Sequence, residues 1–168
     1  MGEIIKLLLS NFSLTLLVLW LLVSIILIFF QRKNKRYLYG RVLAYFLFFN
    51  LGIGGLYGGF MHIAYGDMLA AFIGWPQSPF QFEVGVANLA FGVTGILACF
   101  GNFGFRLATL VNFACFLWGA AAGHIYQMVE HGNFAPGNAG VIFWTDIFVP
   151  LLGFILLYLY NRNSRKYF

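Results

Sequence analysis

The sequence predicts an all-α integral membrane protein with five transmembrane helices. Hydrophobic residues make up 61% of the 168 residues and charged residues only 9%, and the mean hydropathy is +0.84. Soluble domains average about 45–50% apolar and about 25% charged residues, so this composition cannot form a water-facing shell. Five apolar stretches of spanning length account for nearly all of the chain. We therefore expect one transmembrane helical domain over residues 1–168, surrounded by the lipid bilayer.

The first apolar stretch begins at about Ile4 or Phe12 and ends at Phe30, where a basic run stops it. A cleaved signal peptide is the competing interpretation, and it would need a basic start and a small-residue cleavage site. Only Lys6 precedes the stretch, and no such site follows Phe30. We expect a helix that remains in the protein.

Four further stretches are predicted to form the core of the bundle. They run from about Val42 to Tyr65, Phe82 to Phe100, Leu107 to Val129 and Val141 to Tyr160. Small residues on these stretches mark faces where membrane helices approach one another. The first stretch lacks such a stripe, so we place it at the periphery. The apolar segment Met68–Ile73, followed by Trp75, predicts a short helix in the membrane interface.

The basic residues predict the orientation, because short loops rich in Lys and Arg stay cytoplasmic. Nine of the ten basic residues fall on one side of the predicted bundle, and Lys6 falls on the other. The nine are Arg32, Lys33, Lys35, Arg36, Arg41, Arg106, Arg162, Arg165 and Lys166. We expect the N-terminus outside and the C-terminus in the cytoplasm, in the plasma (inner) membrane. Without a basic groove or domain, nothing favours nucleic-acid binding.

The acidic residues and the histidines are predicted to lie on the outer side. One such residue stands out in each core helix: His62, Glu83, His124 and Asp146. Each of the four shares a helix face with a stripe of mostly small residues. His62 shares its face with Gly55, Gly58 and Gly59, and Glu83 shares its face with Ala87, Ala90 and Thr94. His124 shares its face with Ala120 and Ala121, and Asp146 with Pro150 and Gly153. These stripes predict that all four face the inside of the bundle at similar depth.

This cluster has two interpretations. Two imidazoles and two carboxylates can bind zinc, iron or manganese, and nearby methionines make copper another candidate. Alternatively, the four residues pair with one another or with Asn88 and hold the helices in register. A second set of candidate ligands is Asp67, Asn88, Met128, Glu130 and His131. Because ionisable groups inside a membrane are costly and usually functional, the leading hypothesis is an outward-facing pocket that binds or transports a metal ion or a proton.

A faint repeat relates the two halves of the core. Asn50 precedes His62 by the same spacing that separates Asn112 from His124. The repeat predicts that Glu83 and Asp146 occupy equivalent places, as in transporters built from parallel repeats.

The segment from Trp75 to Leu89, with the sequence WPQSPFQFEVGVANL, resembles a family of small multi-spanning membrane proteins of unknown function. The resemblance takes in the second to the fifth helices. It implies a shared fold and importance for Glu83 and Asn88, but no activity.

Motifs of the common hydrolases are missing from the sequence, and Cys99 and Cys115 form no Cys-x-x-Cys pair, so nothing favours an enzyme of these classes. Two other functions stay open. One is an accessory or scaffold subunit of a larger membrane complex or a homo-oligomer. The motifs Gly54-x-x-x-Gly58 and Gly119-x-x-x-Gly123 are candidate contacts between copies, but their place beside the inward-facing histidines favours packing within one chain. The other is a membrane enzyme that handles a lipid or a quinone.

Overall fold

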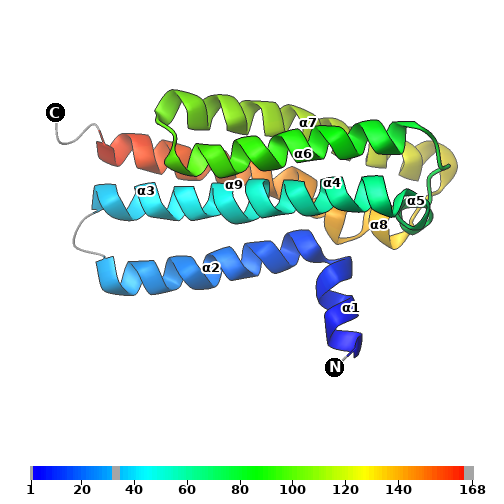
Figure 1. Ribbon diagram of the computed structural model, residues 1–168, viewed down its shortest axis with the longest axis horizontal. Helices are drawn as coiled ribbons and strands as arrows, with labels where there is room; N and C mark the ends of the chain where they lie inside the picture. Colours follow the sequence, from blue (N-terminus) through cyan, green and yellow to red (C-terminus); the bar gives the residue numbers. More distant parts are fainter. Residues whose placement is uncertain (1, 32–34, 165–168) are drawn as a thin grey trace.

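The computed structural model describes residues 2–31 and 35–164, which form a bundle of long helices with short helices at one end (Figure 1). The elements are α1 Gly2–Ser10, α2 Phe12–Gln31, α3 Lys35–Phe46, η1 Leu47–Ile53, α4 Gly54–Ala64, α5 Gly66–Ile73, α6 Phe80–Phe100, α7 Phe103–His131, α8 Pro136–Ala139 and α9 Val141–Ser164. Of the basic residues used to predict the orientation, Arg32, Lys33, Arg165 and Lys166 lie outside the described residues.

Five helical segments of the described chain are long and apolar enough to cross a membrane, as expected. They are Phe12–Phe30, Tyr37–Ala64, Phe80–Phe100, Phe103–His131 and Pro136–Asn163. The second and fourth begin earlier than predicted because they continue through Arg41 and Arg106, whose guanidinium groups are hydrogen-bonded within the bundle. The short helix predicted at Met68–Ile73 is present as α5.

The chain bends between α1 and α2, so that α1 turns away from the long helices (Figure 1). Asn11 donates to the carbonyl oxygen of Leu7 at 3.0 Å at this bend. Tyr57 of α4 holds α1 in place, because its hydroxyl donates to the carbonyl oxygen of Leu9 at 3.2 Å and its ring stacks on Phe12. Beyond the bend, α2 lies at the edge of the bundle and packs mainly on α3 and η1.

The tightest helix pair is formed by α6 with η1 and α4. A Cβ atom added to Gly55 would lie 2.6 Å from the backbone nitrogen of Gly92. A Cβ atom on Gly95 would lie 2.6 Å from the backbone nitrogen of Gly52. The backbones are therefore in direct contact, which is the packing that glycine makes available to membrane helices. The second pair, α7 with α9, packs through larger side chains such as Leu110 and Pro150, both fully buried.

The two ends of the bundle differ in how they are filled. At the end where α3 begins and α9 ends, here called the α3 end, side chains form a continuous apolar core around the fully buried Leu43, Phe46 and Leu47. At the other end, here called the α5 end, α5 and the segment around α8 cross the helix ends (Figure 1). Asn133 connects these two segments by donating to the carbonyl oxygens of Ile73 and Gly74.

Candidate functional site

A cavity of about 1290 Å³ lies between the two helix pairs on the side of the α5 end. Its walls are mostly aliphatic and aromatic side chains from the long helices, α1 and α5. Phe113 and Val149, which belong to the buried core, also line the cavity. Polar side chains on its wall include Asn50, His62, Gln81, Asn88, His124, Thr145 and Asp146. The cavity thus combines a large apolar surface with a few polar groups, which is the usual make-up of a small-molecule site.

His124 of α7 and Asp146 of α9 form the most buried polar pair on this wall. They are only 6% and 8% exposed, respectively. The Nε2 atom of His124 lies 3.6 Å from Asp146 Oδ2, which is longer than the usual hydrogen-bond distance of about 2.7–3.2 Å. As the stripes predicted, both residues face inward, together with the buried Ala121, Pro150 and Gly153.

The hydrogen bonds of Asn138 fix the tautomer of His124. Asn138 donates from Nδ2 to the carbonyl oxygens of His124 and Asn133, at 3.2 and 2.9 Å. Its Oδ1 is therefore the acceptor, and it takes the indole N–H of Trp75 at 2.9 Å and faces His124 Nδ1 at 2.8 Å. His124 accordingly carries a hydrogen on Nδ1. In the neutral imidazole Nε2 then has no hydrogen. It attracts the Asp146 carboxyl group only when a further proton is bound to Nε2 or to the carboxyl group.

His62 of α4 has a different partner. Its Nδ1 lies 2.6 Å from Oε1 of Gln81, in the first turn of α6. His62 is half-buried and lines the same cavity as His124 and Asp146. Three of the four principal residues predicted from the sequence therefore line one cavity.

Glu83 does not share this location, because its side chain is exposed and the prediction that it faces inward is wrong. The face of α6 that packs on α4 carries Gly85, Asn88 and Gly92. Glu83 lies two residues before Gly85, which is about 200° around a helix at about 100° per residue. The sequence prediction chose the stripe with Ala90, whereas the glycines mark the contact because only they let the backbones touch.

The proposed repeat is not matched by the burial of its members. Asn50 is buried in η1, but Asn112 is exposed on α7. Glu83 is exposed, but Asp146 is buried. The two halves therefore place their corresponding polar residues differently.

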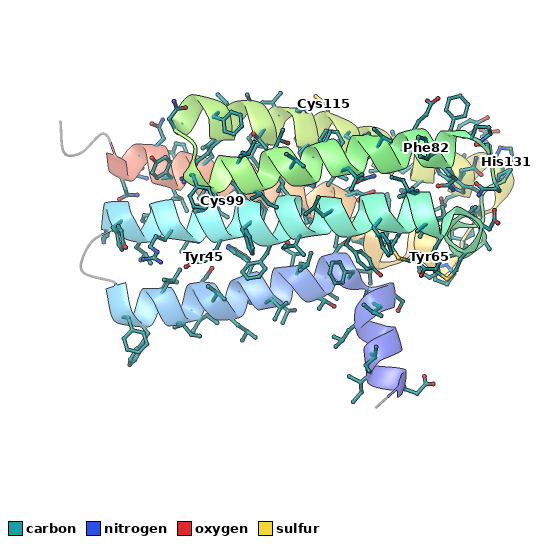
Figure 2. The ribbon with its side chains drawn as sticks, viewed as in Figure 1. Tyr45, Tyr65, Phe82, Cys99, Cys115 and His131 are labelled. Atoms are coloured by element: carbon teal, nitrogen blue, oxygen red, sulfur yellow. The ribbon has the colours of Figure 1, made fainter. Side chains whose placement is uncertain are left out.

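The second set of candidate residues is scattered. Asn88 lines the cavity and donates to the carbonyl oxygen of Val84 at 2.9 Å. Asp67 is exposed and accepts a hydrogen bond from Gln77. Met128 is half-buried, while Glu130 and His131 are exposed at the end of α7, where Figure 2 shows His131.

The arrangement gives little support to a metal centre. The 3.6 Å between His124 Nε2 and Asp146 Oδ2 would allow both atoms to bind one ion at about 2.0–2.2 Å. However, the described residues contain no group of three or more His, Cys, Asp or Glu side chains placed to hold a metal ion. The two cysteines, which Figure 2 shows on α6 and α7, are free thiols.

Asn50 lines the cavity and has one polar side-chain atom without a hydrogen bond to any described residue. Its Nδ2 donates to the carbonyl oxygen of Phe46 at 3.3 Å, which fixes the orientation of the amide. Its Oδ1 is buried and has no hydrogen-bond partner among the described residues. Asn50 lies in η1, a π-helical segment, and such segments are frequent at functional sites.

Sequence reasoning missed two residues that position the polar groups, Gln81 and Asn138. Gln81 occurs in the segment that carries the family resemblance, immediately before the exposed Phe82 that Figure 2 labels. Asn138 occurs in a loop rich in Gly and Asn, where its fully buried side chain could not be anticipated from composition.

A model of a family described as a family of unknown function, DUF6790, matches residues 10–166. This match agrees with the resemblance seen around Trp75–Leu89. Neither a curated protein nor a solved structure matches the chain.

Proposed function

The chain belongs to the DUF6790 family, and we propose that it is a membrane protein that binds a lipid-soluble molecule with a hydrogen-bonding head group. The observation that carries this proposal is the cavity of about 1290 Å³ with apolar walls and few polar groups. Ligand pockets commonly measure about 300–1,000 Å³. The space therefore suits a molecule with a long apolar part.

Insertion into a membrane is supported by the five apolar helices. The shortest candidate span has 19 residues and the longest has 29, whereas about 20 residues cross the hydrocarbon core. Apolar side chains such as Leu22 and Ile26 of α2 and Val93 of α6 are about half exposed and suit contact with lipid tails. The excess of basic residues toward the α3 end supports a cytoplasmic α3 end, with the N-terminus outside.

The head group of the ligand would meet the polar part of the cavity wall. His62, Gln81, Asn88 and Asp146 offer hydrogen-bonding groups there, which favours a head group that forms hydrogen bonds, such as a hydroxyl or an amine. The class therefore includes polar lipids and quinols.

Proton exchange is a second function that one observation favours. The buried His124 and Asp146 lie 3.6 Å apart and both line the cavity, and a proton bound to either would make them attract each other. A proton bound there could pass to or from a ligand head group. Among the ion-binding functions suggested by the sequence, this geometry favours a proton over a metal.

Gly119 offers a direct test of the cavity. It lines the cavity, and nothing lies within 4 Å of a Cβ atom added to it. Gly119→Phe should occupy the space without disturbing the fold, and Gly104→Phe on the same helix is the matched control. Protein purified in mild detergent would be extracted with organic solvent, and the bound molecules would be quantified by mass spectrometry.

We expect a lipophilic molecule in wild-type protein and in Gly104→Phe, at a several-fold lower level in Gly119→Phe. Equal content in all three proteins would overturn the cavity proposal. Stoichiometric zinc, iron, manganese or copper by elemental analysis would restore the metal hypothesis.

The accessory-subunit hypothesis is favoured by α2, because nearly all of this helix outside its contact with α3 and η1 is apolar and uncovered. A larger complex or a second copy would cover this face in place of lipid. A stoichiometric partner retained through purification in mild detergent would support this function, and a monodisperse monomer that retains the ligand would contradict it.

A further inference from the structure

A second cleft, of about 450 Å³, lies at the α3 end, away from the cavity described above. It is bordered by α3, the last turn of α6, the first turn of α7, and α9. Two arginines line it, Arg41 of α3 and Arg106 of α7. Figure 2 shows Tyr45 and Cys99 in this half of the bundle.

Neutral groups hold the guanidinium group of Arg106. Its Nε donates to the carbonyl oxygen of Ala98 at 3.1 Å, and Nη2 donates to that of Cys99 at 2.7 Å. Nη1 donates to the carbonyl oxygen of Gly40 at 3.4 Å. The group also lies 5.1 Å from the centre of the Tyr160 ring. These contacts fix the position of the charge but do not neutralise it.

Arg41 is held in a similar way by aromatic residues of its own helix. Its guanidinium group donates to the hydroxyl groups of Tyr37 and Tyr45. The same group lies 5.3 and 5.7 Å from the centres of the two rings. Both arginines of the cleft are therefore pre-positioned while their charges remain.

None of the five acidic side chains lies near this cleft. They occur in α1, in α5, in the first turn of α6, in the last turn of α7 and in the N-terminal part of α9: Glu3, Asp67, Glu83, Glu130 and Asp146. Keeping two cationic groups in one cleft is costly when none of the described acidic side chains lies beside them, and Arg106 is only 7% exposed. An anion in the cleft would offset this cost.

The depth of the cleft suits a lipid head group. The span Tyr37–Ala64 has 28 residues, or about 42 Å at about 1.5 Å per residue, whereas the hydrocarbon core is about 30 Å thick. The ends of this span must therefore reach the head groups. Arg41 lies about one turn from its start.

We propose that the cleft binds the phosphate of an anionic phospholipid. A guanidinium group has five N–H donors, of which Arg41 uses two and Arg106 three in the bonds above, and the remaining donors match phosphate oxygens. This site rests on the membrane insertion proposed above but not on the ligand of the large cavity.

Native mass spectrometry of the full chain in mild detergent tests the site. Phosphatidylglycerol, phosphatidylcholine and inorganic phosphate would be added separately to wild-type protein, Arg41→Gln and Arg162→Gln. Arg162 is an exposed arginine at the same end and provides the matched control. We expect one tightly retained phosphatidylglycerol in wild type and Arg162→Gln, with retention falling about tenfold in Arg41→Gln, since a hydrogen bond to a charged group is lost.

Equal retention by Arg41→Gln and Arg162→Gln, or equal retention of phosphatidylcholine and phosphatidylglycerol, would overturn the proposal. If inorganic phosphate binds wild type in the same range and displaces the lipid, the cleft is a site for free anions and the lipid assignment is overturned. Loss of the ligand from the large cavity in Gly119→Phe would leave this result unchanged, so the two proposals fail separately.

Discussion

The α3 end and the α5 end of the bundle use similar side chains for different purposes. At the α3 end, residues such as Phe46 and Leu47 fill the space between helices completely. Toward the α5 end, aromatic residues such as Phe116 instead line the cavity between the two helix pairs. Close packing stabilises one end, whereas the other end leaves a cavity of about 1290 Å³ between its helices.

Glycines show the same contrast at a finer scale. Gly92 is pressed against the backbone of the neighbouring helix, and Gly119 borders open space. Substitution by a larger residue should therefore disrupt the helix packing at Gly92 and leave the stability of the fold nearly unchanged at Gly119. Composition alone treats both as small residues of membrane helices.

The largest effect is expected for Gly92→Leu. A Cβ atom at this position would lie 2.6 Å from the backbone nitrogen of Leu56, so α4 and α6 cannot keep their contact. We expect the protein to lose its monodisperse peak in size-exclusion chromatography in detergent. A monodisperse Gly92→Leu protein with wild-type thermal stability would refute the backbone contact and with it the contrast between the glycines.

The second test addresses the filled end through Phe46→Ala. Phe46 is fully buried and packs edge-on against Trp20 with ring centres 5.3 Å apart. Removing the ring should lower the free energy of unfolding by about 3–5 kcal/mol. Thermal or denaturant unfolding in detergent measures this, with Phe116→Ala at the cavity as the comparison. Equal losses at Phe46 and Phe116 would remove the distinction between the two ends.

The third test concerns the polar network of the α5 end through Asn138→Ala. This change leaves the indole N–H of Trp75 and the Nδ1–H of His124 without their acceptor. We expect a loss of about 2–6 kcal/mol in the free energy of unfolding, since each of the two orphaned donors costs about 1–3 kcal/mol. Hydrogen exchange should increase at α5 and α8 and stay unchanged at α3. Faster exchange throughout the bundle would show that the two ends do not unfold independently.

The smallest effect is expected for Gly119→Leu. The added side chain enters open space, so the free energy of unfolding should change by less than about 0.5 kcal/mol. Unfolding in detergent measures this alongside Gly92→Leu. A loss comparable to that of Phe46→Ala would mean that side chains already fill the space beside Gly119.

The sequence predicted those features that depend on hydropathy and on strong small-residue stripes. These include the five apolar helices and the inward direction of His124 and Asp146. The direction of Glu83 was predicted wrongly because α6 carries two stripes, and hydropathy does not rank a glycine stripe above an alanine stripe. The bonds of Asn138 were not predictable because they depend on two loops meeting across the bundle.

The π-helical geometry of η1 gives the second span one more residue than an α-helix would use for the same rotation. The seven residues Leu47–Ile53, at about 4.4 residues per turn, rotate the chain nearly as far as six residues of an α-helix at about 3.6 per turn. Removing one residue from this segment should therefore restore an ordinary α-helix and leave the direction of Gly55 and Gly59 nearly unchanged. A residue removed from α4 between Gly59 and His62 has no such wide turn to absorb it, and it would rotate His62 by about 100° away from Gln81.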